Sequence, residues 1–280
     1  MERLKTFFKS KTWRIIWGTL KLLISIPIFC ASVFAIYQFL FSSNNKKFKL
    51  AENTQGSYYS DFMFNRLLKS EPKNSKFWWE SSVAYNKNGE FEEGMRRLNK
   101  ANCLNATDHL GYTGWIKYTK LKDYENALKD FHRLDKLSNV VEYPWGENIY
   151  FQMGICHQGL GNYDSAVVYY DKFVASEKNP DNIYPRMYTY HGKIEADQKN
   201  YEKALDFYNK TISLDKNIAE AYYYKAETYN QLNKKDSAKS NYLKSLDFLS
   251  STNKCNSNKI IGGYPPMISQ VLNLICEKNI

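Results

Sequence analysis

The stretch from Ala219 to Leu246 reads AEAYYYKAETYNQLNKKDSAKSNYLKSL and contains a sparse, spaced set of small and aromatic residues. That set is Tyr222, Ala226, Tyr229, Ala238 and Tyr242. Thirty-four positions upstream the spacing recurs with one slot lost, at Tyr188, Gly192, Glu195, Ala204 and Tyr208. It recurs again at Tyr150, Gly154, His157, Ala166 and Tyr170, and in a more degraded form at Trp78, Ser82, Tyr85, Gly94 and Leu98. A repeat of this length predicts a solenoid of stacked helical hairpins.

Each unit is expected to be two antiparallel helices, A followed by B. A small residue in the middle of helix A lets a neighbouring helix approach closely, and the aromatic residues fill the space around it. The turn between the helices has its own signals, at Asn88-Gly89-Glu90-Phe91, Leu160-Gly161-Asn162-Tyr163 and Lys199-Asn200-Tyr201. Gly or Asn there ends helix A in the left-handed conformation, and the aromatic residue that follows packs back on it.

This pattern resembles the tetratricopeptide repeat family. A further copy fits residues 122–131, with either Gly114 or Trp115 in the small slot of its helix A. Upstream, Tyr58 to Ser70 followed by Pro72 is similar to a lone helix B. The resemblance covers about residues 56–250 and implies an all-α solenoid of about five repeats plus a half unit. It also implies binding of peptides, helices or folded proteins, without a catalytic residue in the repeat.

The first fifty residues differ from the rest of the chain. Leu22 to Phe41 is a run of 20 residues without a charge, which as a helix spans about 30 Å, the thickness of the hydrocarbon core of a bilayer. A cleaved signal peptide is the alternative, but no small-x-small cleavage triplet follows the run, and the residues before Cys30 are not those of a lipoprotein signal. The sequence therefore predicts a basic flank at 1–21, a transmembrane helix at 22–41, a linker at 42–55, the solenoid at 56–250, and a polar connection with a capping helix at 251–280.

The distribution of charge predicts an orientation. Six basic residues precede the apolar run and three follow it, so the N-terminus is expected in the cytoplasm and the repeats outside it, as in a bacterial inner-membrane protein facing the periplasm. Residues 1–49 hold nine Lys/Arg and one acidic residue, a net charge of +8, and leave +2 of the total of +10 for residues 50–280. The repeats are thus nearly neutral, and no nucleic-acid partner is expected. The first seventeen residues fit either an interfacial helix or a disordered basic tail.

Motifs for catalysis are missing from the sequence. There is no Gly-rich phosphate loop, no His-Glu-x-x-His and no Gly-x-Ser-x-Gly. We therefore expect no enzyme activity, no cofactor and no metal site. Cys156 falls in a helix A and is expected to be a buried thiol. Cys255 and Cys276 flank the C-terminal segment, and the sequence allows either a disulfide between them or two free thiols.

The concave face formed by the stacked helices A is where a partner is expected to bind. The resemblance implies inward positions at Trp79, Val83, Asn86 and Lys87, at Tyr112, Ile116 and Lys120, at Phe151, Ile155 and Gln158, at Thr189, Lys193 and Asp197, and at Tyr223, Glu227 and Asn230. The N-terminal half of this groove would be aromatic and apolar, and the C-terminal half polar with mixed charge. The alternative is that Trp79 and Phe151 are shielded by adjoining helices. Family members that bind chaperone tails use Lys and Asn in slots that carry Trp79 and Val83 here, so that ligand is not expected.

Two segments depart from the repeat. Residues 140–146, VVEYPWG, lengthen one connection and are either a contact loop or packed on the edge of the solenoid. Residues 267–275 have a helical apolar spacing and either cap the solenoid or dock a partner.

Taken together, these features predict a membrane-anchored scaffold or adaptor. It would bind a partner protein through the concave groove as part of a multiprotein assembly of the cell envelope. The alternatives are a membrane receptor for client proteins that faces the cytoplasm, and a solenoid that associates with itself.

Overall fold

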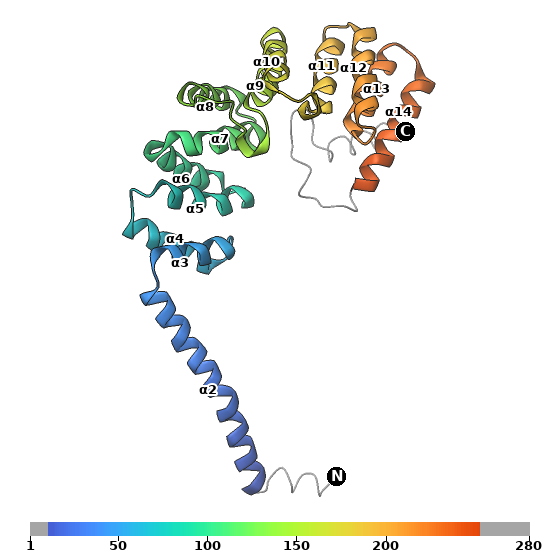
Figure 1. The fold of residues 1–280 in the computed structure, drawn as a ribbon. Coiled ribbons are helices and arrows are strands. Elements are labelled where there is room, and N and C mark those ends of the chain that lie inside the picture. Colours follow the sequence, from blue (N-terminus) through green and yellow to red (C-terminus); the bar gives the residue numbers. More distant parts are fainter. Residues whose placement is uncertain (1–10, 253–280) are drawn as a thin grey trace, which may run out of the picture. The chain divides into compact units, whose positions relative to one another are not determined.

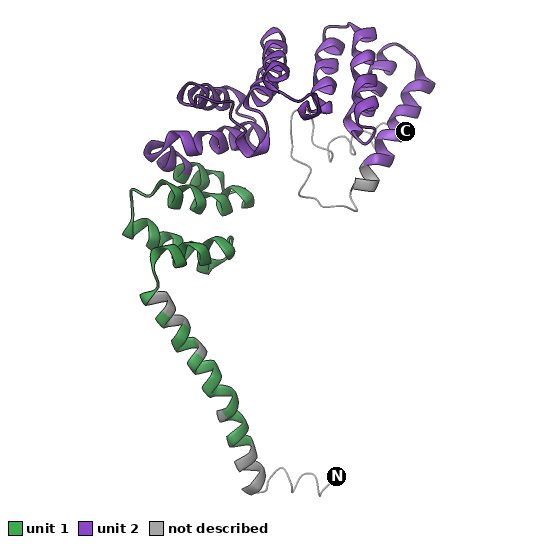
Figure 2. Cartoon of the chain, viewed as in Figure 1, with its two compact units in different colours: residues 1–97 green, residues 98–280 purple. Residues whose placement is uncertain are grey.

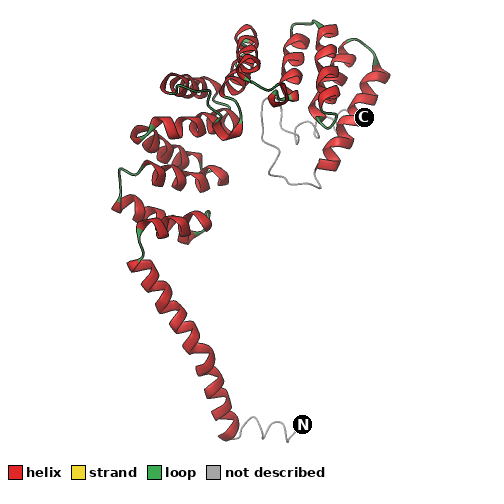
Figure 3. Cartoon of the chain, viewed as in Figure 1, coloured by secondary structure: helices red, strands yellow, loops and turns green. Residues whose placement is uncertain are grey.

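The computed structural model describes residues 11–252, which form helices joined by short turns, with no strand in that range (Figure 3). The first helix is α2 (Lys11–Phe41), and consecutive hairpins follow it (Figure 1). Their helices are α3 (Asn44–Asn53) with α4 (Tyr58–Ser70), α5 (Ser75–Asn88) with α6 (Phe91–Leu104), α7 (Ala106–Ile116) with α8 (Tyr124–Leu137), α9 (Ile149–Gly159) with α10 (Tyr163–Ser176), α11 (Pro185–Asp197) with α12 (Tyr201–Leu214), and α13 (Ala219–Gln231) with α14 (Lys235–Thr252). The all-α solenoid expected from the repeat is confirmed.

The chain divides into two compact units, residues 1–97 and residues 98–280 (Figure 2). In the first unit, α3, α4 and the start of α5 share a core of Phe48, Ala51, Met63, Phe64, Leu67, Leu68 and Phe77. In the second unit, buried residues of α12, α13 and α14 form a core of Ala204, Leu205, Tyr208, Ala219, Tyr223, Tyr224, Ala226, Ala238 and Tyr242.

The structure differs from the sequence expectation at residues 42–55, where a linker was predicted. α3 occupies Asn44–Asn53 and pairs with α4, so the segment from Tyr58 to Ser70 is not a lone helix B. Ser43 caps α3 by accepting a hydrogen bond from the backbone N–H of Lys46. Phe48 holds the helix in place, because its ring lies 6.1 Å from that of Phe64 and 5.2 Å from that of Phe77.

The small slots of helix A face an aromatic residue of helix B. A Cβ built on Gly154 would lie 2.4 Å from the ring of Tyr170, and one on Gly192 would lie 2.7 Å from the ring of Tyr208. Both rings are fully buried. The small residue is therefore required by the close approach of the two helices.

The same contact settles which residue fills the small slot of α7. A Cβ on Gly114 would lie 2.7 Å from the ring of Phe131, so Gly114 fills the slot, rather than Trp115. Here the two residues are 17 apart in sequence, whereas Gly154 and Tyr170 are 16 apart. A short π-helix, η1 (Lys117–Leu121), follows α7 and accommodates the extra residue, since a π-turn contains one residue more than an α-turn.

The turns between paired helices use the left-handed conformation that was predicted. Gly89 and Gly161 have φ of +83° and +76°, and Gly at both positions removes the steric penalty. In the third predicted turn Lys199, rather than Asn200, has positive φ.

Cys156 is fully buried, as predicted. The predicted capping helix at 267–275, and the pair Cys255 and Cys276, lie outside the described residues.

Candidate functional site

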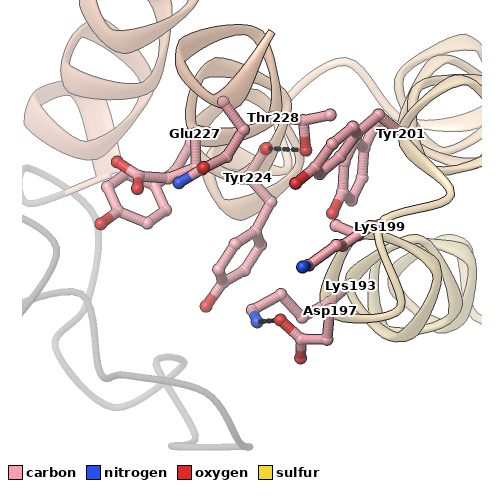
Figure 4. Close-up of a pocket in the computed structure, with 11 residues that line it drawn as sticks. Lys193, Asp197, Lys199, Tyr201, Tyr224, Glu227 and Thr228 are labelled. Carbon is pink, nitrogen blue, oxygen red and sulfur yellow. Dashed lines mark hydrogen bonds and ion pairs between the residues drawn. The ribbon is translucent and has the colours of Figure 1, made fainter.

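An open cavity of about 350 Å³ lies in the second unit, between α11, the start of α12 and α13 (Figure 4). Four of the residues predicted to face the groove, Lys193, Asp197, Tyr223 and Glu227, line this cavity together. The other lining residues are Ala196, Lys199, Tyr201, Tyr208, Tyr224, Thr228 and Gln231. The sequence predicted a polar C-terminal half of the groove with mixed charge, and the lining of this cavity contains both lysines and carboxylates.

The charges of the cavity are balanced. Lys193 forms an ion pair with Asp197, one helical turn further along α11 (Figure 4). Glu227 accepts a hydrogen bond from the phenol of Tyr242. Two lysines, Lys193 and Lys199, thus accompany two carboxylates in the lining. The cavity has no net charge to select a strongly charged ligand.

Tyr224 lines the cavity, and its phenol is a buried hydrogen-bond donor. Tyr224 is 4% exposed, and its hydroxyl has no hydrogen-bond partner among the described residues. Burial raises the pKa of Tyr224 well above its usual value, so the phenol stays protonated and can donate. Figure 4 shows the phenol pointing from α13 to the side where Lys193 and Asp197 lie. A buried donor without a partner is unfavourable, so an acceptor on a ligand would offset that penalty.

The predicted inward residues nearer the N-terminus mostly lie in the core. Those that are buried are Val83, Asn86, Tyr112, Ile116, Phe151, Ile155 and Gln158, together with Thr189 of α11. Trp79 is half-buried, whereas Lys87 and Lys120, like Asn230 of α13, are exposed. The aromatic and apolar half of the groove that the sequence predicted is therefore a packed surface.

Specific contacts explain this burial. The rings of Tyr184 and Tyr190 lie 5.0 and 5.9 Å from that of Phe151, so adjoining residues shield Phe151, as the alternative prediction had it. The amide of Gln158 accepts a hydrogen bond from the Tyr170 phenol at 2.7 Å and donates one to the Tyr190 carbonyl at 3.1 Å. The Asn86 side chain faces α6, because a Cβ on Gly94 would lie 2.2 Å from its Oδ1.

Comparison with known proteins identifies the repeat. The family model for the tetratricopeptide repeat matches residues 147–180, 185–218 and 219–248. The chain therefore contains tetratricopeptide repeats. Tetratricopeptide repeats typically form scaffolds for protein–protein interaction, and this general function applies to the present chain.

Relatives and solved structures agree with the tetratricopeptide repeat assignment. Anaphase-promoting complex subunit 3 of Schizosaccharomyces pombe is 25% identical over 185 residues, which are 66% of this chain and 26% of that protein. Photosystem I assembly protein Ycf3 of Acaryochloris marina is 34% identical over 74 residues, which are 26% of this chain and 44% of that protein. The chain thus spans less than half the length of these curated relatives.

Two solved structures show the fold over most of the chain. A tetratricopeptide repeat protein from Parabacteroides merdae has a TM-score of 0.61 at 15% identity, covering 88% of this chain and 90% of its own. PilW, described as a widely conserved type IV pilus biogenesis factor, has a TM-score of 0.55 at 15% identity and covers 82% of this chain and 98% of its own. At such identities the similarity concerns the fold alone.

The long connection between two of the tetratricopeptide repeats packs against α7. Its short 3₁₀ turn, η2 (Pro144–Gly146), places the Trp145 ring 4.8 Å from that of Tyr112 and 5.3 Å from that of Trp115. Trp145 remains 46% exposed. The connection therefore covers Tyr112, one of the residues that the sequence assigned to the groove, and packing is its evident role.

Sequence reasoning missed a polar network in the first unit, between α4, α5 and α6. Arg97 lies over the ring of Tyr85 at 4.5 Å and donates to Glu93 at 2.6 Å and to Asp61 at 3.3 Å. The Tyr85 phenol donates to Asp61 at 2.6 Å, and burial together with this hydrogen bond raises the pKa of Tyr85 to about 12. The hydrogen bond from Arg96 is the main reason that the pKa of Glu93 falls to about 2. Asp61 and Tyr85 also line a second cavity, of about 320 Å³, which contains none of the predicted site residues.

Proposed function

We propose that this protein is a membrane-anchored scaffold that holds a segment of a partner protein in the cavity between α11 and α13. The observation that carries this proposal is the cavity itself, where Lys193, Tyr223 and Glu227 come together with the Tyr224 donor. An open, phenol-rich cavity with balanced charge suits a neutral segment that has both apolar surface and a hydrogen-bond acceptor, such as a backbone carbonyl.

The membrane anchor is proposed from α2. In the part of the chain that the structure describes, one helix is long and apolar enough to cross a membrane, with its most apolar window at Trp17–Phe34 and a mean hydropathy of 1.7 there. None of that window is buried. A core helix of a soluble protein would bury such a window, so the exposure of its apolar side chains favours a membrane helix or an uncleaved signal anchor.

The repeats are proposed to lie outside the cytoplasm, in an assembly of the cell envelope. Six basic residues before the apolar run against three after it support this orientation. A cytoplasm-facing receptor would have the same groove and the opposite topology. Protease added to spheroplasts digests the repeats only if they lie outside.

Site-specific crosslinking in intact cells tests the groove. A photoreactive residue is placed at Gln231, an exposed residue of the cavity lining, and, as a matched control, at Lys203, an exposed residue of α12 that does not line the cavity. We expect the Gln231 probe to capture one partner protein and the Lys203 probe not to. The capture should fall when Glu227→Lys or Lys193→Glu unbalances the charge of the lining.

Two results would count against the groove. One is equal capture by the probes at Gln231 and Lys203, and the other is capture that both charge-reversal variants leave unchanged. Recovery of a second copy of this chain at Gln231 would replace the scaffold by a self-associating solenoid.

A further inference from the structure

The α3–α4 hairpin follows the proposed span almost directly. Ser42 and Ser43 alone separate Phe41, the last residue of α2, from Asn44, the first residue of α3. Three Cα–Cα steps of about 3.8 Å limit the distance from Phe41 to Asn44 to about 11 Å. Because the apolar run ends at Phe41, α3 begins close to the surface of the bilayer.

This hairpin is also where the positive charge of the repeats is concentrated. Residues 44–70 contain five Lys/Arg and two acidic residues, a net charge of +3, whereas residues 71–280 together have a net charge of +2. Lys46 and Lys49 are exposed on α3, and Arg66 and Lys69 are exposed on α4. Clustered basic residues next to a span are attracted to anionic headgroups.

Exposed aromatic residues accompany these charges. Tyr58, the first residue of α4, is 91% exposed, and Tyr59 and Phe62 are 40% and 43% exposed. Tyr58, Phe62, Arg66 and Lys69 follow one another at helical spacing, opposite the buried Phe64 and Leu67. Tyrosine rings beside basic residues are typical of the membrane–water interface.

We propose that the α3–α4 hairpin lies flat on an anionic bilayer, with the lysines of α3 at the headgroups and Tyr58, Tyr59 and Phe62 in the interfacial layer. The proposal rests on the membrane anchor proposed above. The occupant of this surface is lipid because the surface continues from the span and because its 27 residues carry +3 of the net charge of +5 of residues 44–280.

The orientation of the hairpin makes the proposal testable. α3 has ten residues and is about 15 Å long. If α3 stood upright on the membrane, Tyr58 would lie about 15 Å or more above the surface, beyond the Debye length of about 8 Å at physiological salt. If the hairpin lies flat, Tyr58 contacts lipid.

The test places the photoreactive residue benzoylphenylalanine at Tyr58 of the full-length chain, reconstituted in vesicles of phosphatidylcholine with or without phosphatidylglycerol. The matched control has the same probe at Val168 of α10, which is 52% exposed. We expect lipid adducts at Tyr58 but not at Val168, detected by mass spectrometry. The adducts should decrease at least about fivefold without phosphatidylglycerol, or in the variant Lys46→Gln/Lys47→Gln/Lys49→Gln.

Flotation of the vesicles after alkaline carbonate treatment separates the two proposals. If the chain floats but the Tyr58 probe labels lipid no more than the Val168 probe does, the flat hairpin is overturned and the anchor stands. If the chain does not float, the anchor fails and the hairpin proposal fails with it. A protein adduct at Tyr58 in native membranes, in place of lipid, would assign the surface to a protein partner and overturn the proposal.

Discussion

At the scale of single residues, the fold depends on glycines that let an aromatic ring approach the backbone of helix A. Gly154 shows this best, because the Tyr170 ring that it faces is fully buried and is held by a hydrogen bond to Gln158. The ring therefore cannot move away from an added methyl group.

We expect Gly154→Ala to reduce the free energy of unfolding by about 1–2 kcal/mol. Overpacking costs about 1–3 kcal/mol, and the better helix propensity of Ala returns up to about 1 kcal/mol. Urea denaturation monitored by circular dichroism measures the change. Adding Tyr170→Leu to Gly154→Ala should make the loss less than the sum of the two single losses.

Gly161→Ala is a control variant, because it would destabilise the fold through backbone conformation and not through contact with a ring. Nothing lies within 4 Å of a Cβ at Gly161, but its φ is +76°. We expect Gly161→Ala to lower the free energy of unfolding by about 1 kcal/mol through backbone strain. Adding Tyr170→Leu should leave this decrease unchanged. Full additivity of Gly154→Ala with Tyr170→Leu would rule out the ring contact as the cause.

At the scale of elements, the start of α9 is fixed by one buried side chain. Asn148 is fully buried, and its Oδ1 accepts from the backbone N–H of Tyr150 at 2.9 Å. Its Nδ2 donates to Ser176 Oγ at 2.9 Å and to Glu177 Oε1 at 2.8 Å. This residue therefore both caps α9 and ties it to the end of α10.

We expect Asn148→Ala to lower the free energy of unfolding by about 2–3 kcal/mol. A lost N-cap costs about 1 kcal/mol, and leaving the acceptors on Ser176 and Glu177 unpaired adds a further cost. Asn162, at the start of α10, is a matched control because its side chain makes no capping hydrogen bond. Asn162→Ala should cost less than about 0.5 kcal/mol. Similar losses for the two variants, measured by chemical denaturation, would contradict this role of Asn148.

At the scale of the whole molecule, stability should depend on pH through the histidines. Burial lowers the pKa of all four, His109, His132, His157 and His191. The unfolded chain then binds protons more readily than the folded chain at pH values just below about 6.5, the ordinary pKa of histidine. The stability that the neutral histidines provide is therefore complete above pH 6.5 and is lost as the pH falls below it.

We expect the Tm to decrease between pH 7.5 and 5.5, measured by calorimetry, and the variant His191→Gln to have a weaker decrease. His191 is a suitable choice because its ring stacks on that of Phe207 at 4.2 Å. Burial raises the pKa of Glu80 and Asp130, which gives the opposite trend with pH, and the comparison with His191→Gln removes their contribution. A pH slope that His191→Gln leaves unchanged would exclude His191 as a source of it.

The sequence predicted the regular repeats well because each places a small and an aromatic residue at fixed spacing. The family model likewise matches from residue 147 onward. It does not match α7, where the π-helix shifts Phe131 by one position relative to Gly114. Sequence reasoning missed α3 for another reason: a ten-residue helix with two buried residues, Phe48 and Ala51, has too little periodicity to detect.

The candidate site was predicted only at its C-terminal end. Lys193, Tyr223 and Glu227 line one cavity, because α11 and α13 follow the regular repeat. Tyr112 is covered by Trp145, and spacing within helix A contains no information on how a distant connection folds over it. Tyr224 was missed because a tyrosine in a packing helix gives no sign that its hydroxyl lacks a partner.

The contact between each small residue and the ring of the next helix also constrains how such a chain can evolve. A larger side chain at Gly154 is tolerated only if the residue at Tyr170 becomes smaller, and the same holds for Gly192 with Tyr208 and for Gly114 with Phe131. Substitutions at these positions are thus accepted in pairs. Among descendants of a common ancestor, the two members of each pair should vary together, at a separation of sixteen positions in a regular unit and of seventeen where the π-helix intervenes.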